Sequence, residues 1–311
     1  MNQSALVKLT RQLIAFVNLN STASIFECKR SADGSYTSDG CSPVGSMPYG
    51  EGETTYQCRF EAENWHCNIE KCVLLMGDSI LDNSYWNDVG TNTTAEILKK
   101  HMKVIDRATE EATTATLIDA LDSDVGISVR AEYVTNRNRL GIPYDGQFRG
   151  DQVVVYPIPN SDSIWWKLEE KNRYVVVSIG GNDLALSHTF ELNTIMTSVE
   201  KCLNMIVEKL KIERSHLIYL IPYPPTETMC DILKDQNLTI SGGRVTPKEF
   251  YTQMTKRANE VCSTLKVSVI SLEDFGPADR AGRYIPEPTP KGAAEIAKRI
   301  KERITVASPS D

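Results

Sequence analysis

The sequence predicts an α/β fold in which parallel strands are flanked by helices. Residues 73–76 and 175–179 are short apolar runs, which is typical of strands buried on both faces of a sheet. Each run ends at a glycine, Gly77 or Gly180, where the chain can turn sharply. Helical segments separate these strands from the later ones, and this alternation predicts a parallel sheet with right-handed crossovers.

The remaining elements follow from apolar runs and from amphipathic periodicity. Further strands are predicted at residues 103–107, 216–221 and 267–271. Helices are predicted at residues 1–24, 93–101, 115–121, 198–210, 247–264 and 291–305. Thr246 and Pro247 mark the start of the fifth of these helices, since threonine caps a helix and proline fits its first turn.

Composition limits the classes of partner. The chain has 311 residues and a net charge of -7, with 41% hydrophobic and 24% charged residues, which predicts a globular protein. A nucleic-acid-binding surface needs a basic face, so nucleic acid is not an expected partner. No apolar run is long enough to span a membrane. Lys8 and Arg11 interrupt the apolar positions near the N-terminus, so we identify no clear signal peptide, and the oligomeric state is unknown.

Residues 25–70 are rich in Gly, Ser, Thr and Cys without a sustained period, so we expect a loop-rich module there. Five of the eight cysteines crowd into the first quarter of the chain: Cys28, Cys41, Cys58, Cys67 and Cys72. Such clustering favours disulfides in an oxidising compartment, with the cytoplasm as the alternative. A zinc site is the less favoured alternative, because no Cys-x-x-Cys pair is present. Its candidate ligands would be Cys28, Cys41, Cys58, His66 and Cys67. We divide the chain into a helix and Cys-rich module at residues 1–71 and an α/β domain at residues 72–308.

Ser79 follows the first buried strand and is expected beside the N-terminus of the next helix. Ligands bind at the carboxyl ends of the strands in open α/β sheets, and the positive end of a helix favours a developing oxyanion. Ser79 is therefore a candidate nucleophile, by the mechanics of the nucleophile elbow in other hydrolases. The tripeptide Gly-Asp-Ser alone is equally typical of an ordinary turn.

Two strings carry a family resemblance. Gly-Asp-Ser-Ile-Leu-Asp-Asn, which contains Ser79, and Gly-Gly-Asn-Asp, which contains Asn182, resemble the first and third sequence blocks of the SGNH/GDSL hydrolase superfamily. The resemblance implies a flavodoxin-like three-layer α/β/α sandwich with a parallel sheet. It also implies that the Asn182 side chain donates to an oxyanion hole, with Asp78, Gly181 and Asp183 beside it in the pocket.

A third oxyanion donor in that superfamily is the backbone N–H of a glycine after the second strand. Glu111 or Ala112 occupies the matching place in this chain. Every residue except proline keeps its N–H, so the donor need not be lost. Glu111 would add unwelcome negative charge if its side chain pointed inward.

The last block of the superfamily, Asp-x-x-His, is replaced in this chain. Glu287 stands at the position of the histidine and Tyr284 at the position of the aspartate. Burial would raise the pKa of Glu287 and make it a better base, and Tyr284 would be placed to hydrogen-bond it. Of the four histidines, His188 alone is expected near this edge of the sheet, where a solvent-exposed or structural position is favoured for it.

Two functions fit these residues. The first is a serine ester hydrolase, acting on a small-molecule, glycan or lipid ester, with Ser79, Glu287 and Asn182 as catalytic residues and with no cofactor and no metal. The second is a catalytically inactive binding protein on the same fold; a third, less favoured, gives the main activity to the Cys-rich module. Residues 122–173 are long for a connection, so Trp165 and Trp166 either line an acyl or sugar pocket or lie on a short helix packed on the sheet.

Overall fold

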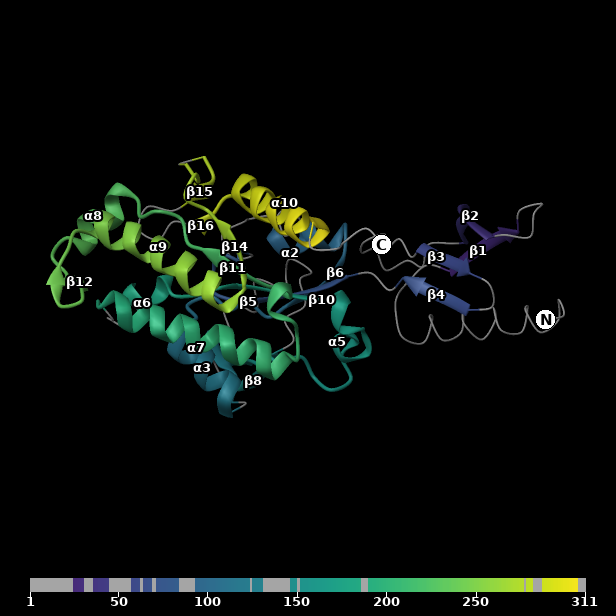
Figure 1. The fold of residues 1–311 in the computed structure, drawn as a ribbon, viewed down its shortest axis with the longest axis horizontal. Helices are drawn as coiled ribbons and strands as arrows, with labels where there is room; N and C mark the ends of the chain where they lie inside the picture. The colour runs from purple at the N-terminus through teal and green to yellow at the C-terminus, as the bar shows by residue number, and fades with distance from the viewer. Residues whose placement is uncertain are drawn as a thin grey trace. The chain divides into compact units, whose positions relative to one another are not determined.

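A computed structural model describes most of the chain as two compact units, Met1–Glu70 and Lys71–Asp311 (Figure 1). The described residues are 25–30, 36–44, 57–61, 64–68, 71–83, 93–123, 125–130, 146–149, 152–185, 190–276, 278–281 and 287–306. The helix expected at residues 1–24 lies outside them. The α/β fold belongs to the second unit.

The first unit contains two antiparallel strand pairs. These are β1 (Ile25–Arg30) with β2 (Tyr36–Val44), and β3 (Gln57–Glu61) with β4 (Asn64–Asn68). The register places Cys28 opposite Cys41 and Cys58 opposite Cys67. The expected loop-rich module is therefore wrong for these segments. Two-stranded pairing rests on backbone hydrogen bonds, so it needs no apolar period that the sequence would reveal.

The cysteines with described side chains form no disulfide. They are free thiols at Cys72, Cys202, Cys230 and Cys262. Cys28, Cys41, Cys58, Cys67 and His66 have side chains outside the described set. The disulfide expectation is thus unsupported. Within the described part of the chain, no three His, Cys, Asp or Glu side chains are grouped as a metal ion would need.

A five-stranded parallel sheet forms the centre of the second unit. Its order is β14 (Ser268–Ser271), β11 (Leu217–Ile221), β10 (Arg173–Ser178), β5 (Cys72–Gly77) and β6 (Lys103–Asp106). Each neighbouring pair runs parallel. Numbered along the chain, this is the 2-1-3-4-5 order of flavodoxin-like folds. The winding reverses between β5 and β10, and ligands bind at the carboxyl ends of strands at such a point.

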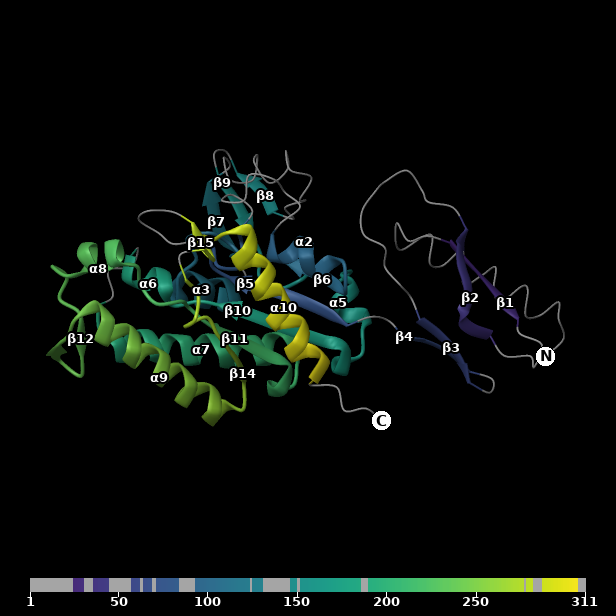
Figure 2. The ribbon, with the colours of Figure 1, turned by 90° about the horizontal axis from the view of Figure 1, so that it is seen from above.

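Alternate strand residues pack against two different helix layers, which confirms the three-layer sandwich. On one face, Leu74 and Val175 pack with α3 (Thr114–Ser123), α7 (Leu192–Leu210) and α9 (Pro247–Leu265). On the other, Val73 and Val176 pack with α2 (Thr94–Lys99) and α10 (Pro290–Val306). Figures 1 and 2 show α2 and α10 on the side of the sheet opposite α3 and α7. Burial of both faces explains why the strands read as unbroken apolar runs.

Shorter elements complete the unit. A small three-stranded sheet has the order β7 (Ile127–Arg130), β9 (Gln152–Val155), β8 (Gly146–Arg149). Two further strand pairs are present: β12 (Thr239–Ile240) pairs with β13 (Gly243–Arg244), and β15 (Arg280–Ala281) pairs with β16 (Glu287–Pro288). The short helices are α5 (Ile164–Lys167), α6 (Gly181–Ala185), α8 (Glu227–Leu233) and the 3-10 turns η1 (Glu170–Asn172) and η2 (Arg214–His216).

The predicted strands and helices of residues 72–305 are confirmed with shifted boundaries. The largest shift is at α7, predicted from residue 198 but beginning at Leu192, because Glu191 caps it by accepting from the Thr194 N–H at 2.9 Å. Trp165 is fully buried on α5, and Trp166 packs against the same core. The short-helix alternative for these tryptophans is therefore the correct one.

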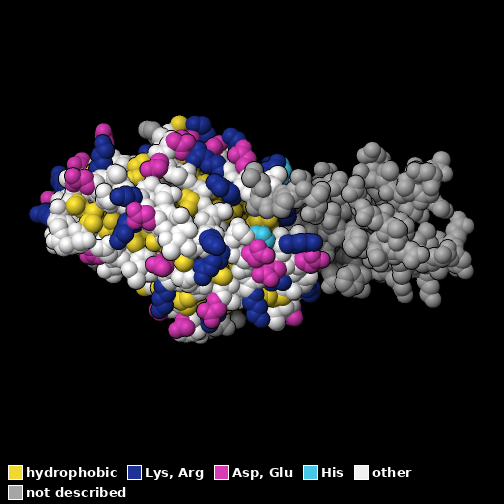
Figure 3. Space-filling model, viewed as in Figure 1, with side chains coloured by type: hydrophobic (Ala, Val, Ile, Leu, Met, Phe, Trp, Pro, Cys, Tyr) yellow, Lys and Arg dark blue, Asp and Glu magenta, His cyan; other side chains and the backbone are white. Residues whose placement is uncertain are grey.

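On the face that Figure 3 presents, acidic and basic side chains are interspersed over the second unit. Among the described residues, no helix has the length and apolar character that crossing a membrane requires.

Candidate active site

Ser79 lies on a tight turn at the carboxyl end of β5. The turn begins at Gly77, whose φ of 101° is a conformation that side-chain-bearing residues rarely adopt. The Asp78 N–H donates to the Ser178 carbonyl of β10 at 2.8 Å, and the Leu81 N–H closes the turn on the Asp78 carbonyl at 3.1 Å. The helix N-terminus expected beside Ser79 is wrong for the described residues: residues 78–81 form a hydrogen-bonded turn after β5, and the next described helix, α2, begins at Thr94. The Ser79 N–H has no hydrogen-bond partner among the described residues.

Glu287 reaches Ser79 from the far end of the chain. It is 2% exposed and Ser79 is 7% exposed. The β15–β16 pair carries Glu287 opposite Ala281, and the Thr289 N–H holds the strand end by donating to the Asp279 carbonyl at 3.0 Å. Burial raises the pKa of Glu287 well above its ordinary value, while a side-chain hydrogen bond with Ser79 opposes that rise. Ser79 and Glu287 both line the same cavity.

The second oxygen of Glu287 is buried without a partner. Its Oε2 accepts no hydrogen bond from any described residue. The nearby carboxyls of Asp78, Glu110 and Asp82 raise the pKa of Glu287 further. A buried carboxylate without full hydrogen bonding is unstable relative to its protonated form, so this group readily takes a proton.

Asp78 is the second buried acid at the site. Its Oδ1 accepts from the Ile80 N–H at 3.2 Å. Burial raises the pKa of Asp78 to about 7, against the opposing effect of the hydrogen bond from the Ile80 N–H. The folded protein therefore holds this proton more tightly than the unfolded chain does.

Replacing Asp78 by asparagine is expected to stabilise the protein at pH 8 but not at pH 4. Because the folded pKa is raised from 3.8 to about 7, the stability from this group is full below pH 3.8 and is lost as the pH rises through 7. The loss at pH 8 is on the order of 4 kcal/mol. Urea unfolding at both pH values measures the difference. Glu249→Gln is the control: hydrogen bonds from Thr246 lower the pKa of Glu249, so its removal gives no gain at either pH.

The loop after β6 approaches the same turn. The Thr109 N–H donates to the Gly77 carbonyl at 2.7 Å. Glu111 has a φ of 63°, the left-handed conformation that favours glycine, and its side chain is exposed. The Ala112 N–H donates to the Thr109 carbonyl at 3.1 Å, whereas that of Glu111 has no partner among the described residues. Of the two candidates, Glu111 therefore has the glycine-like backbone and the unengaged donor.

Asn182 lies on α6, at the carboxyl end of β10. Its Nδ2 donates to the Ala112 carbonyl at 3.1 Å, so one amide hydrogen fixes the side chain and the second remains to donate. Gly181, beside it, lines the cavity. Asp183 does not line the cavity: its carboxylate accepts from the Thr114 N–H at 3.1 Å and from the Thr114 hydroxyl. Asp183 instead joins α6 to the start of α3.

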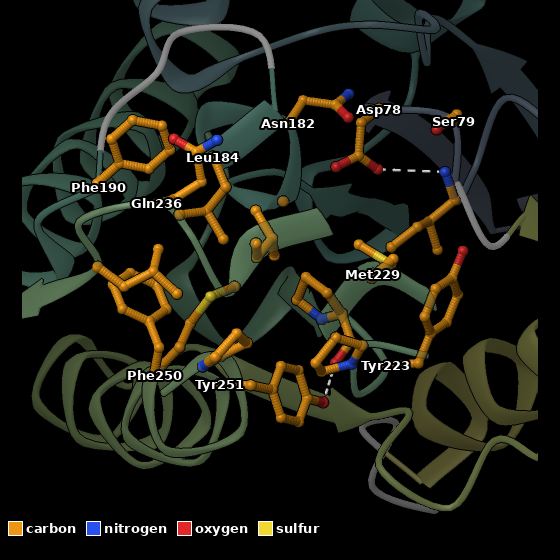
Figure 4. Close-up of a pocket in the computed structure, with 18 of the residues that line it drawn as sticks. Asp78, Ser79, Asn182, Leu184, Phe190, Tyr223, Met229, Gln236, Phe250 and Tyr251 are labelled. Carbon is orange, nitrogen blue, oxygen red and sulfur yellow. Dashed lines mark hydrogen bonds between the residues drawn. The ribbon is translucent and has the colours of Figure 1, made fainter. Parts of the chain in front are cut away.

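A cavity of about 380 Å³ opens at Ser79 (Figure 4). Asp78, Ser79, Asn182 and Glu287 contribute its polar groups at one end. The rest of the lining is chiefly apolar and comes from the turn after β5, from α6, from the residues just before α7, from α9 and from the chain between β11 and α9. Its apolar and aromatic members are Ile80, Leu184, Phe190, Pro222, Tyr223, Pro225, Met229, Leu233, Leu238, Pro247, Phe250, Tyr251 and Met254. No described residue between 122 and 173 lines it, so the described part of that stretch does not form this pocket.

The histidines give no described base at this site. His216 is buried at the opposite edge of the sheet, its ring 4.5 Å from that of Tyr174, and His101 is exposed after α2. Both positions agree with the prediction that they lie far from Ser79. His188 and Tyr284 fall outside the described residues, so their predicted places near the site stay predictions.

The family comparison agrees with this fold. Residues 73–300, more than half of the chain, match the GDSL-like lipase/acylhydrolase family. No curated protein sequence matches the chain. Similar solved structures include a lipase/acylhydrolase from Enterococcus faecalis, with 16% identity, coverage of 78% of this chain and 99% of that chain, and a TM-score of 0.44.

Two further structures are similar to the chain. A member of the lipolytic protein G-D-S-L family from Veillonella parvula has 12% identity, coverage of 74% of this chain and 96% of that chain, and a TM-score of 0.42. A carbohydrate acetylesterase from Sinorhizobium meliloti has 11% identity, coverage of 75% and 99%, and a TM-score of 0.41. With the family match over residues 73–300, the chain belongs to the GDSL-like lipase/acylhydrolase family of the SGNH hydrolase superfamily.

Proposed function

We propose that this protein is a serine ester hydrolase in which Ser79 is the nucleophile and Glu287 is the general base. The observation that carries the proposal is that these two buried side chains line the same cavity, beyond the carboxyl end of β5, and that Ser79 lies near enough to affect the pKa of Glu287. The chain has a carboxyl where its relatives' pattern has a histidine, and burial supplies the basicity that an exposed carboxylate lacks.

The reaction proceeds in two halves. The Ser79 hydroxyl oxygen attacks the ester carbonyl carbon as its proton passes to Glu287, and the carbonyl electrons move onto the oxygen. The tetrahedral intermediate collapses, the alcohol leaves with the proton returned by Glu287, and an acyl–Ser79 ester remains. Water then attacks that ester, giving its proton to Glu287, and the carboxylic acid is released with Ser79 restored.

The N–H groups of Ser79 and Glu111 and the second amide hydrogen of Asn182 are the proposed oxyanion donors. The proton transfer moves negative charge away from Glu287, whose Oε2 is unsolvated, and onto an oxygen that meets these donors. Both changes lower the barrier, because the charge leaves a place without hydrogen bonds and arrives at a place that has them.

The competing function is a binding protein that has lost catalysis. The same cavity would accept an apolar ligand, and a protonated Glu287 would hydrogen-bond it. One favourable observation is the raised pKa of Glu287, which keeps the carboxyl protonated at lower pH. The two functions differ in whether Ser79 reacts.

Labelling with a fluorophosphonate tests the difference, because this probe bonds covalently only to an activated serine. We expect wild-type protein to be labelled and Ser79→Ala not to be. Ser271→Ala is a matched control, since Ser271 also ends a strand of the sheet but its hydroxyl donates to Glu273 at 3.1 Å; its labelling should equal that of wild type. A folded wild-type sample that is neither labelled nor active on p-nitrophenyl esters would decide for the binding protein.

A further inference from the structure

The long axis of the cavity separates the reacting groups from an apolar end. In Figure 4, Asp78 and Ser79 lie at one side of the view and Phe190 and Phe250 at the other, with Asn182 and Leu184 between them. Tyr223 lies at the Ser79 side, and burial together with the nearby Glu287 carboxyl raises its pKa. The space therefore extends from the reacting groups past α6 toward α9.

The chemistry of the lining selects a neutral, apolar occupant. Among the described residues that line the cavity, the charged ones are Asp78 and Glu287, both acidic, and none is Lys, Arg or His. An anionic substituent would meet only repulsion there. A sugar would bring many hydroxyls to walls made of Leu184, Phe190 and Phe250, where they would lose their hydrogen bonds to water.

The volume sets the length of that occupant. A cavity of about 380 Å³ holds on the order of a dozen water-sized groups at ~30 Å³ each. An acetyl group would fill a small part of it and leave apolar walls facing water. A straight chain of roughly eight to ten carbons would fill most of it, since a methylene is similar in size to a water molecule.

The position of Glu287 indicates that the apolar hydrocarbon chain is the acyl part of the ester and not the alcohol part. In the proposed reaction Glu287 returns its proton to the leaving oxygen, so the alcohol lies at the Glu287 and Tyr223 end. The acyl substituent then points the other way, past Asn182 toward Leu184. We propose that this enzyme is selective for esters of medium-length, unbranched, apolar acyl chains, and that Leu184 and Phe250 set the preferred length. This inference rests on the proposed hydrolysis.

Two hydrogen bonds hold the outer wall of the cavity in place, which supports a fixed length for the bound acyl chain. The Thr239 N–H donates to the Phe190 carbonyl at 2.8 Å, and Glu191 accepts from the Ser241 N–H at 3.0 Å. These bonds join the segment before α7 to the β12–β13 pair. Phe190 and Leu238, which both line the cavity, are thereby held next to each other.

The test measures kcat/KM for p-nitrophenyl esters with acyl chains of two to sixteen carbons. Burial of one methylene is equivalent to about a fourfold increase, so we expect octanoate to exceed acetate by at least ~100-fold and longer chains to gain nothing further. Leu184→Trp, which narrows the middle, should move the optimum to shorter chains. Phe250→Leu, which opens the far end, should move it to longer ones. Val261→Ala, on α9 but not part of the cavity lining, should leave the optimum unchanged.

A second readout separates this inference from the hydrolysis. Calorimetric titration of the Ser79→Ala variant with 1-decanol and 1-butanol measures chain binding without reaction, and tighter binding of decanol is expected. Acetate as the best ester in a protein that fluorophosphonate labels would overturn the chain inference and keep the hydrolase. A gain with length only in alkyl acetates would overturn the acyl assignment. Decanol binding without any hydrolysis or labelling would support the apolar chain site and overturn the hydrolase.

Discussion

Glu287→Gln is expected to lower kcat/KM for ester hydrolysis by at least ~100-fold, the lower end for a lost general base. Glutamine keeps the size of the side chain and its place on β16, but its amide cannot accept the Ser79 proton. The comparison is made with a p-nitrophenyl ester at saturating and subsaturating concentration. Glu295→Gln is the matched control, because Glu295 lies on α10 in contact with Arg299 and away from the cavity; its rates should equal those of wild type.

The pH dependence identifies the same group independently. Because burial raises the pKa of Glu287 well above its ordinary value, the base form accumulates only as the pH rises through that raised pKa. Wild-type kcat/KM should therefore increase tenfold per pH unit and then level off at the pKa of the free enzyme. The residual rate of Glu287→Gln should lack this limb.

Glu287→His restores the family's usual residue and sharpens the test. Burial shifts the pKa of an imidazole downward, whereas it shifts that of a carboxyl upward. An active histidine variant should thus have its pH limb displaced from that of the wild type. Full activity of Glu287→Gln with an unchanged pH profile would show that Ser79 is activated by some other group.

The sequence predicted the sheet well because its strands are buried on both faces. Residues such as Val73–Met76 lie between helices α2 and α7, and this environment demands a continuous apolar run that a reader of the sequence can find. The β1–β2 and β3–β4 pairs carry no such constraint, and they were missed. The local sequence pattern therefore predicts strands that are buried in the core. It does not predict strand pairs that are held by backbone hydrogen bonds alone.

The residues of the site also divide into those that local sequence predicts and those that it does not. Ser79 and Asn182 were found because each follows a buried strand at a glycine turn, where local sequence fixes the geometry. The cavity wall was not found, since Phe190 and Phe250 are distant in the sequence and have the apolar character of any core residue. Their only shared signal is a packing arrangement that forms when α9 packs beside α7 and α8. Glu111 shows the intermediate case: the sequence offered two candidates, and the backbone angles and hydrogen bonds of the folded chain separate them.

Gly77→Ala is expected to destabilise the protein by more than ~4 kcal/mol, a large part of the stability of a typical domain. A methyl group at this position would lie 1.8 Å from the Ser178 carbonyl oxygen, and the φ of 101° is unfavourable for alanine in any case. Neither neighbour can move, because β5 and β10 are hydrogen-bonded to each other and to further strands on both sides. Urea unfolding followed by circular dichroism measures the loss.

Gly242→Ala separates the two causes of the stability loss in Gly77→Ala, which are the unfavourable backbone angle and the steric conflict with Ser178. Gly242 also has a positive φ, 80°, but an added methyl would meet nothing within 4 Å. It should therefore lose only the backbone contribution, about 1–2 kcal/mol. The excess at Gly77 is then the steric conflict between the serine turn and the adjacent strand. A Gly77→Ala protein that unfolds at the wild-type urea concentration would mean that the two strand ends are not in contact, and the oxyanion geometry built on that contact would fall with it.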